Sequence, residues 1–294
     1  MDTGLQKYRA FVATAEAGSI AHAADRLGYS ISSVSRMVSD LEASCGLRLF
    51  DRSKAGVALT PDGQRLLVRA RSIVDECDRF ADEAASIAGA EVGTVRVGTI
   101  ASVATHVFPK VLKSFRSTHP GVSCELLMGD YNEIDRWLSE GRIDMGTVRV
   151  PAAKGLNTIT LVRDAYKAVL PSGHAMARRK RFPLAAFAKE PYLALERGGL
   201  SEVASLLERN SVELTPTFTV WDDYAVMAMV EAGLGLAILP SIMLQRCAYN
   251  VVALPLDVPA KREVALAWRS ERSLSAAATA FLEECSMASQ DKLR

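Results

Sequence analysis

The sequence predicts an α+β multidomain protein in which a small N-terminal unit, one long helix and a larger α/β unit follow one another. Three observations indicate this order. Two capped helices and two short strands occupy the first unit, apolar residues then recur every three or four positions, and strand and helix patterns alternate through the rest of the chain. We therefore expect domains at residues 1–60, 61–89 and 93–294.

The N-terminal unit contains two helices separated by a tight turn. Ser19 and Ser30 each stand where a helix start needs a side-chain oxygen, and Gly28 stands where the first helix ends and a positive φ is needed. The second helix has one apolar face, formed by Val34, Met37, Val38 and Leu41. Its other face carries short hydroxyls and one long cation, namely Ser32, Ser33, Ser35, Arg36 and Ser39. This pattern predicts a helix-turn-helix whose second helix enters the DNA major groove. An ordinary helical hairpin with a solvated polar face is the alternative.

A predicted strand pair after Gly46 favours the DNA-binding interpretation. Its turn carries Arg52 and Lys54, where the wing of a winged helix-turn-helix contacts the phosphate backbone. Between residues 26 and 71 there are eight basic and four acidic residues, although the formal net charge of the chain is only +1. Phosphate binding depends on such a local patch and not on the total charge.

A longer string of residues surrounds these elements. It comprises Leu5, Phe11, Val12, Gly18, Ala23, Ala24, Leu27, Leu41, Glu42, the run from Gly46 to Arg52 and the run from Leu59 to Gly63. With Ser19, Ser35 and Arg36, this string resembles the DNA-binding end of the LysR-type transcriptional regulators. The family usually has Gln-Pro at the start of the recognition helix, where this chain has Ile31-Ser32, so an apolar contact, for example to a thymine methyl, replaces the usual base-contacting Gln. The candidate DNA-binding residues are Ser19, Ser30, Ile31, Ser32, Ser33, Ser35, Arg36, Ser39, Arg52 and Lys54.

A long helix is predicted from Thr60-Pro61, with Thr as N-cap and Pro at the first helical position. It would span about 40 Å at 1.5 Å per residue. Its apolar positions alternate by four and three residues, which is the seam of a helix that pairs with a copy of itself. The candidate dimerisation residues are Leu66, Ala70, Ile73, Cys77, Phe80 and Ala84. Packing against its own domain is the alternative, while the resemblance implies paired linker helices in a dimer or tetramer.

The C-terminal half alternates strands with helices, which predicts a mainly parallel sheet covered on both faces. Strands are expected over 94–100, 122–128, 143–148, 167–170, 191–195, 217–221, 233–240 and 263–268. Helices are expected over 103–117, 131–140, 200–209, 223–231 and 274–287. We divide this half into two α/β lobes, 93–165 with 266–294, and 166–265, joined by two crossing strands.

Two lobes of this kind enclose a cleft at the carboxyl ends of their strands, where open α/β sheets bind ligands. The motifs Gly141–Gly146 and Val230–Pro240, with Phe115 and His119-Pro120, resemble the effector-binding domain of the same family, which is built like a periplasmic binding protein. Ser102 matches that family's ligand-contacting Ser. The candidate effector-binding residues are Ser102, Asp130, Tyr131, Arg197, Gly198 and Trp221. For each of them the alternative is that the residue caps a helix or lies in a surface loop without contacting a ligand.

The expected effector is a small anion. Ser102 begins a helix directly after a strand, and Gly198-Gly199 precede another helix with Arg197 beside it. Helix N-termini present free N–H groups and the positive end of the helix dipole, which favours a carboxylate. An apolar or aromatic ligand held against Tyr131 and Trp221 is the alternative.

Other chemistry is sparse in the sequence. The five cysteines form no Cys-x-x-Cys pair, and the four histidines show no metal-ligand spacing, so we expect no metal, cofactor or disulfide, and a redox-sensing thiol is only a minor alternative. No nucleophile with a recognisable base occurs, so we expect no enzyme. A secreted solute-binding protein would need a signal peptide, and none is recognisable, so we expect a cytoplasmic protein without membrane contact. The expected partners are double-stranded DNA, a small-molecule effector and further copies of the chain, with RNA polymerase as another candidate.

Overall fold

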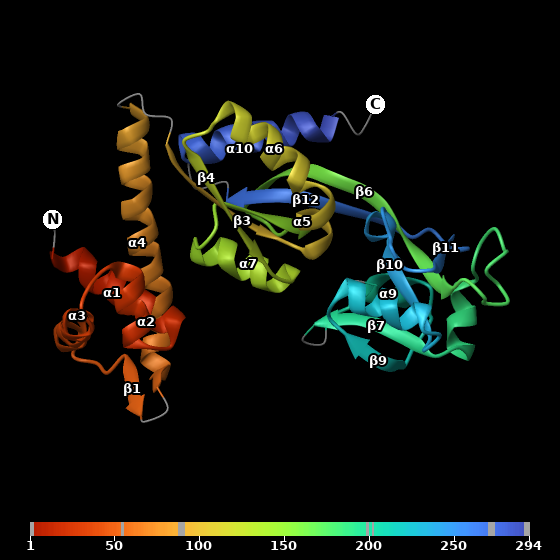
Figure 1. The fold of residues 1–294 in the computed structure, drawn as a ribbon, viewed down its shortest axis with the longest axis horizontal. Coiled ribbons are helices and arrows are strands. Elements are labelled where there is room, and N and C mark those ends of the chain that lie inside the picture. The colour runs from red at the N-terminus through yellow and green to blue at the C-terminus, as the bar shows by residue number, and fades with distance from the viewer. Residues whose placement is uncertain are drawn as a thin grey trace.

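The computed structural model describes residues 3–53, 56–87, 92–197, 200–201, 203–269 and 274–290. Its N-terminal unit consists of helices α1 (Thr3–Ala17), α2 (Ile20–Leu27) and α3 (Ile31–Cys45) and the antiparallel strands β1 (Phe50–Ser53) and β2 (Gly56–Leu59) (Figure 1). The three helices and the strand pair share one apolar core, in which the rings of Phe11 and Phe50 meet edge to face. This is the predicted winged helix-turn-helix.

The local signals at the helix ends act as expected. Ser30 Oγ accepts a hydrogen bond from Ser33 N at 3.1 Å, and Ser19 Oγ accepts one from His22 N at 3.5 Å. Gly28 ends α2 with a φ of 69°, a conformation that side chains with a Cβ rarely adopt. These caps fix the turn and therefore the direction in which α3 leaves it.

Helix α4 (Pro61–Ile87) follows the wing, with Thr60 as its N-cap: Thr60 Oγ1 accepts a hydrogen bond from Gly63 N at 2.9 Å. The predicted seam divides into two parts. Ala70 is buried in the core of the N-terminal unit and Leu66 packs against that core, so the expectation that Ala70 faces a partner helix is wrong. The remaining positions of the seam are exposed, with Ile73 at 40% and Phe80 at 76%, followed by Cys77 and Ala84.

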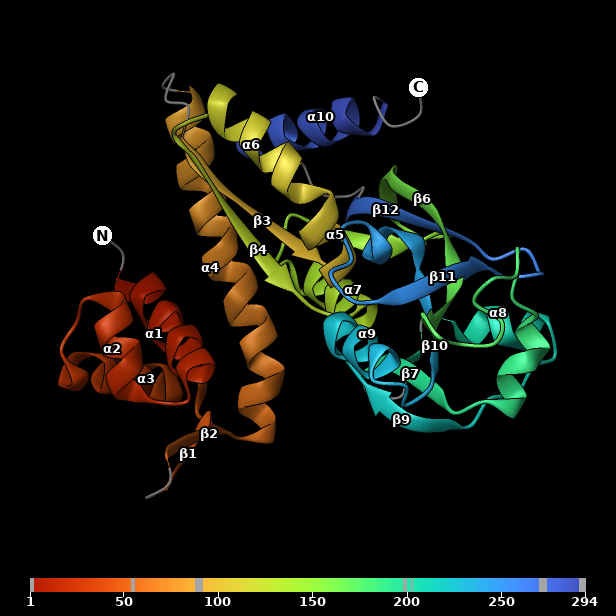
Figure 2. The same cartoon turned by 45° about the vertical axis from the view of Figure 1, so that its right-hand side comes forward.

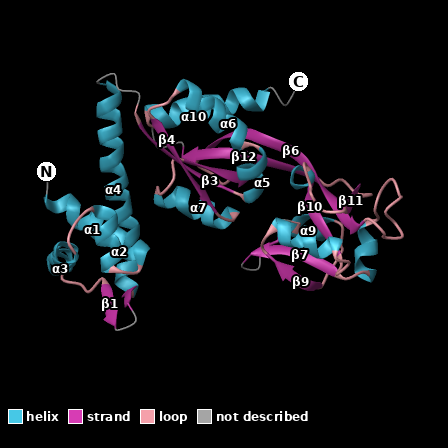
Figure 3. Cartoon of the chain, viewed as in Figure 1, coloured by secondary structure: helices cyan, strands magenta, loops and turns pink. Residues whose placement is uncertain are grey.

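The first lobe of the C-terminal half is built on strands β3 (Gly93–Thr99), β4 (Val122–Met128) and β5 (Met145–Arg149) and on parts of β6 (Leu156–Pro171) and β12 (Lys261–Arg269), in the order β4-β3-β5-β12-β6. Strands β3, β4 and β5 are parallel, and β12 is antiparallel to its neighbours. Helices α6 (Phe108–Thr118) and α10 (Ala276–Gln290) cover one face of this sheet and α7 (Tyr131–Glu140) the other (Figure 3).

The second lobe continues from the far half of β6 through β10 (Leu236–Pro240) and β7 (Tyr192–Arg197) to β8 (Leu200–Ser201), with β11 (Val251–Pro255) paired to β6 and β9 (Pro216–Val220) paired to β7. Helix α9 (Asp223–Glu231) packs on one face of this sheet, and α8 (Ala204–Arg209) with the 3₁₀ turn Leu184–Lys189 packs on the other. Helix α5 (Ala101–His106) and the 3₁₀ turn Ser241–Leu244 lie where the lobes meet.

Several predicted elements differ from the structure. The helix expected over 103–117 is divided at Val107, because Pro109 lacks an N–H and is accommodated in the first turn of a new helix, α6. The helix expected over 200–209 begins only at Ala204, since Leu200–Ser201 pairs with β7 as β8. Strand β6 is sixteen residues long and passes through both lobes, whereas only its 167–170 portion was expected. Strand β11 was not expected at all.

Helix α7 links two regions of the molecule. Its N-terminal end lies at the cleft between the lobes, while Glu140 at its C-terminal end accepts a hydrogen bond from Ser72 Oγ of α4 through its carbonyl at 3.2 Å (Figure 2). Arg79 of α4 also pairs with Asp144, just beyond α7, at 3.1 Å. Helix α7 sits close on the sheet, since a Cβ on Gly146 would come within 2.5 Å of the Ile134 side chain.

Candidate functional site

The polar face of α3 is open to solvent. Ser32, Arg36 and Ser39 are exposed, Ser33 and Ser35 are partly buried, and the opposite side of the helix packs Val34, Val38 and Leu41 into the core. Ile31 at the start of the helix is 57% exposed. Ser30 Oγ lies 2.9 Å from Ser32 Oγ and 2.8 Å from Ser33 Oγ, so these three hydroxyls form one cluster at the tip of the helix. Small hydroxyl side chains beside a long cation allow close approach to a groove.

The wing is placed beside this helix as an antiparallel pair in which Phe50 faces Leu59 and Ser53 faces Gly56. Arg52 belongs to β1, but its side chain lies outside the described part of the chain, and so does all of Lys54. Glu42 of α3 fixes the start of β1, because its carboxylate accepts hydrogen bonds from the N–H groups of Leu49 and Phe50. The strand pair is therefore tied directly to α3.

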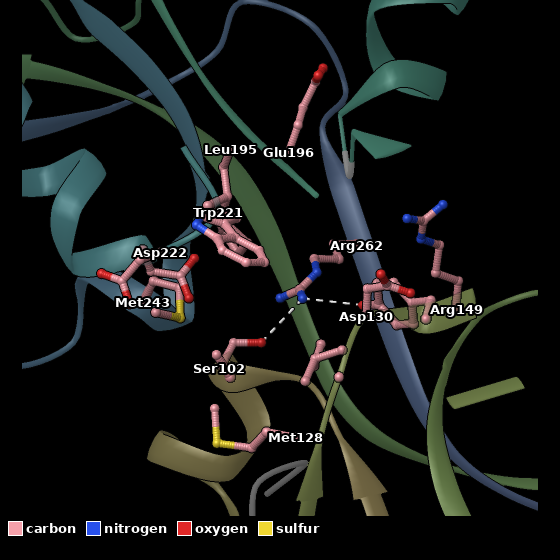
Figure 4. Close-up of a pocket in the computed structure, with 16 residues that line it drawn as sticks. Ser102, Met128, Asp130, Arg149, Leu195, Glu196, Trp221, Asp222, Met243 and Arg262 are labelled. Carbon is pink, nitrogen blue, oxygen red and sulfur yellow. Dashed lines mark hydrogen bonds between the residues drawn. The ribbon is translucent and has the colours of Figure 1, made fainter. Parts of the chain in front are cut away.

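A cleft of about 210 Å³ lies between the two lobes, at the carboxyl ends of β3, β4, β7 and β9 (Figure 4). Four of the predicted effector residues line it: Ser102, Asp130, Tyr131 and Trp221. The side chain of Arg197 and the whole of Gly198 lie outside the described residues. Its volume is below the 300–1,000 Å³ or so typical of drug-sized sites, which suits a small ligand.

The floor of the cleft is organised by Arg262 of β12, which is only 7% exposed. Its Nη2 donates to Ser102 Oγ at 3.2 Å and to the Tyr131 hydroxyl at 3.3 Å (Figure 4). Its Nη1 lies 3.6 Å from Asp164 Oδ2, and that same oxygen accepts a hydrogen bond from Ile242 N at 3.1 Å. A buried guanidinium is thus held by groups from three separate segments and directed toward the cleft.

Arg149, at the end of β5, adds a second cation on the same lobe. Its guanidinium carbon lies 4.5 Å from the centre of the Tyr131 ring, in the geometry of a cation–π contact. Neither Arg262 nor Arg149 was expected from the sequence. Arg149 directly follows the apolar run ending at Val148, so its place at the carboxyl end of a predicted strand, like that of Ser102, could have identified it. Arg262 precedes the predicted strand 263–268, so no such signal marks it.

Acidic residues cap the two helices of eight residues or more that begin at the cleft. Asp130 Oδ1 accepts from Glu133 N at 2.9 Å at the start of α7, and Asp222 Oδ1 accepts from Ala225 N at 2.8 Å at the start of α9. The expected helix start after Gly198-Gly199 is wrong, because β8 precedes α8. The cationic group that could bind an anion in the cleft is therefore Arg262 and not a pair of helix N-termini.

The described residues contain no group of three or more His, Cys, Asp or Glu side chains that could hold a metal ion, and no described helix is both long and apolar enough to cross a membrane. All five cysteines are free thiols. Burial and the nearby Glu284 raise the pKa of Cys285 to about 12, and burial raises the pKa of its neighbour Cys124. These two thiols are thereby disfavoured as thiolates.

The architecture and the two sites define a DNA-binding transcriptional regulator with a ligand-binding regulatory domain. Comparison with protein families supports this: residues 5–64 match the bacterial regulatory helix-turn-helix of the lysR family, and residues 88–289 match the LysR substrate binding domain. The chain belongs to the LysR-type family of transcriptional regulators.

Relatives and solved structures agree with this assignment. The chain is 29% identical over 282 residues to the uncharacterized HTH-type transcriptional regulator YvbU of Bacillus subtilis, covering 95% of this chain and 96% of the relative. It is 34% identical over 191 residues to a probable hydrogen peroxide-inducible genes activator of Mycobacterium avium, covering 65% and 61%. The full-length regulator CbnR in complex with its target DNA has the same fold, with a TM-score of 0.72, 24% identity and coverage of 98% and 100%.

A mutant of OxyR from Corynebacterium glutamicum with bound hydrogen peroxide is similar over the whole of this chain and 93% of its own, at 26% identity and a TM-score of 0.61. Structural and sequence similarity thus extends over both the DNA-binding and the ligand-binding parts of this chain.

Proposed function

We propose that this regulator binds a small carboxylate, or another small anion, in the cleft between its lobes, and that this binding controls its action at promoters. The observation that carries the proposal is the buried Arg262, which reaches Ser102 and Tyr131 at the floor of the cleft. Guanidinium groups bind carboxylates through paired, charge-assisted hydrogen bonds, and such bonds are about twice as strong as neutral ones.

The surroundings of Arg262 support recognition of an anion. The guanidinium is removed from bulk water, so its attraction for a ligand charge is screened less than at the surface, while the Asp164 carboxylate 3.6 Å away offsets part of its charge. Ser102 is 5% exposed and offers a hydroxyl beside it. An apolar or aromatic ligand held by Tyr131 is less favoured, because that phenol is 7% exposed and its hydroxyl already accepts from Arg262. Trp221, at 70% exposure, is the one aromatic lining residue of the described cleft that could offer a ring face to a ligand.

We do not propose peroxide sensing, although some relatives are named as probable hydrogen peroxide-inducible genes activators. Reactive sensor thiols need a thiolate in an accessible site. Two of the five thiols, those of Cys124 and Cys285, do not meet this need, because burial raises their pKa values; the two exposed thiols, Cys45 and Cys77, lie outside the regulatory domain.

On the DNA side, we propose that α3 enters the major groove with Arg36 and the serine cluster at its tip, while the wing contacts phosphates. The exposed part of the α4 seam, Ile73, Cys77, Phe80 and Ala84, would pair with a second copy. Effector binding would then change the relative orientation of the lobes, and with it the spacing of the DNA-binding units in a dimer or tetramer.

The test is ligand binding by the full-length protein, measured by isothermal titration calorimetry with small carboxylic acids and the neutral amides of the same acids. We expect acids to bind and amides to bind at least tenfold more weakly, since hydrogen bonds to charged groups are worth about 1.5–3 kcal/mol. Arg262→Lys keeps the positive charge but loses the planar fork of the guanidinium, so it should reduce the preference for the acid, whereas Arg163→Lys, at an exposed position of β6 outside the cleft, should not. Equal binding of acids and amides would contradict the proposal.

A further inference from the structure

The two walls of the cleft carry charges of opposite sign. Among the described residues that line it, Arg149 ends β5 of the first lobe, and Arg262 lies on the crossing strand β12, where it bonds to Ser102 and Tyr131 of the first lobe. The second lobe contributes Glu196 from β7 and Asp222 and Asp223 from the start of α9. The first lobe also contributes one carboxylate, Asp130, which caps α7 with one oxygen as Asp222 caps α9, so the first wall carries two positive charges and one negative charge and the second wall carries three negative charges.

A ligand that carries only negative charge suits one wall and not the other. Carboxylates on the second wall would repel it, and this repulsion grows as the lobes close and exclude water. The same wall is suited to a cation. Asp222 uses one oxygen in its cap and has a second that can accept further hydrogen bonds. Next to it, the exposed ring of Trp221 offers a face for a cation–π contact.

We propose that the effector is amphoteric: a small molecule with a carboxylate that lies against Arg262 and Ser102, and an ammonium or similar cation that lies against Asp222 and the Trp221 ring (Figure 4). This inference rests on the proposed function for the position of the carboxylate and adds the second charge. An amphoteric ligand bonds to both lobes at once and so stabilises their closed arrangement. A simple carboxylate engages the first lobe alone and has little differential affinity for the closed form.

The competing explanation is that the opposed charges pair directly with one another when the lobes close, with no cation from a ligand. The test compares compounds in sets of three that share a carbon skeleton: an L-amino acid, its deaminated carboxylic acid and its decarboxylated amine. The skeletons are those of the protein amino acids, and binding to the full-length protein is measured by calorimetry. At least one amino acid should bind about tenfold or more tightly than both of its counterparts.

One variant and a matched control locate the second charge. Asp222→Asn removes the negative charge and keeps the helix cap, because Asn caps as well as Asp. It should weaken binding of the amino acid about tenfold and leave binding of the deaminated acid unchanged or tighter. The matched control is Asp257→Asn, since Asp257 also accepts a backbone N–H, from Leu184 at 2.9 Å, but lies outside the cleft. It should change neither affinity.

Each outcome is decisive. If deaminated acids bind as tightly as amino acids, the amphoteric ligand is wrong and the carboxylate proposal stands. If amino acids bind best but Asp222→Asn does not reduce the difference in affinity, Asp222 does not bind the cation of the ligand and the inference is overturned. If no compound with a carboxylate binds, or only the amines bind, both the inference and the carboxylate proposal fail.

Discussion

Asp75 of α4 provides a quantitative test of how the linker helix packs on the regulatory domain. Burial raises the pKa of its carboxyl from 3.8 to about 6, although the nearby Arg96 and Arg79 act in the opposite direction. The folded state therefore binds this proton more tightly than the unfolded chain does. The associated stability is fully present below pH 3.8 and is lost as the pH rises through about 6.

The magnitude follows from the same shift. At 1.36 kcal/mol per pKa unit, the rise corresponds to about 3 kcal/mol, and we halve it to about 1–2 kcal/mol because the side chain still reaches water. Asp75→Asn removes the charge at almost constant shape, so it should stabilise the protein by about 1–2 kcal/mol at pH 7.5 and by progressively less toward pH 4.

Urea unfolding of the full-length protein, followed by circular dichroism between pH 4 and pH 7.5, measures this difference. Glu76→Gln is the control on the same helix, because Glu76 is exposed and its 3.9 Å contact with Arg79 is a surface ion pair worth about 0–1 kcal/mol. If Asp75→Asn destabilises the protein at pH 7.5, or stabilises it equally at all pH values, the charge of Asp75 is not buried against the regulatory domain in the way described.

Three further predictions concern DNA binding and assembly. Arg36→Ala should weaken binding to the specific promoter site by about 1–3 kcal/mol and leave non-specific binding nearly unchanged if the side chain contacts a guanine edge, which competition binding assays measure. Arg52→Ala should weaken binding to all sequences and lower the slope of log affinity against log salt by about 1, as expected for one lost phosphate contact; an unchanged slope would exclude that contact. Phe80→Asp should convert the dimer to monomer in sedimentation experiments while the monomer stays folded, since Phe80 is 76% exposed in the single chain. Gln64→Asp, on an exposed part of the same helix, is its control, and a Phe80→Asp protein that remains dimeric would place the interface elsewhere.

Local chemistry made some elements predictable to the residue. Strand β4 and helices α7 and α9 begin and end at the predicted residues. For α7 the reason is clear, because Asp130 and Gly141 mark its two ends: Asp130 forms a capping box with Glu133, and Gly141 has a φ of 73°. Signals of this kind act over a few residues and are visible in a linear sequence.

The contacts that make the cleft were not predictable in this way. Arg262 and Ser102 are 160 positions apart and meet only because β12 crosses back along β6. The partner of the α4 seam could not be predicted either. Periodicity identifies the apolar side of a helix, but it does not show whether that side packs on its own domain or on another chain. Ala70 is covered by its own domain, whereas Phe80 on the same seam is exposed.

Helix α7 has a mechanical consequence for the whole regulator. Its ten residues form a helix about 15 Å long, with the cleft at its N-terminal end and the linker helix α4 at its C-terminal end. A tilt of roughly 10° about one end would carry the other by about 2.5 Å over this length. Helix α7 packs closely on the sheet at Gly146, so we expect a tilt to move the whole helix and not only its nearest side chains. We therefore expect an alanine at Gly146 to push α7 away from the sheet, because its Cβ would meet the Ile134 side chain at 2.5 Å, and to change the regulator's response to its effector through the contact of α7 with α4.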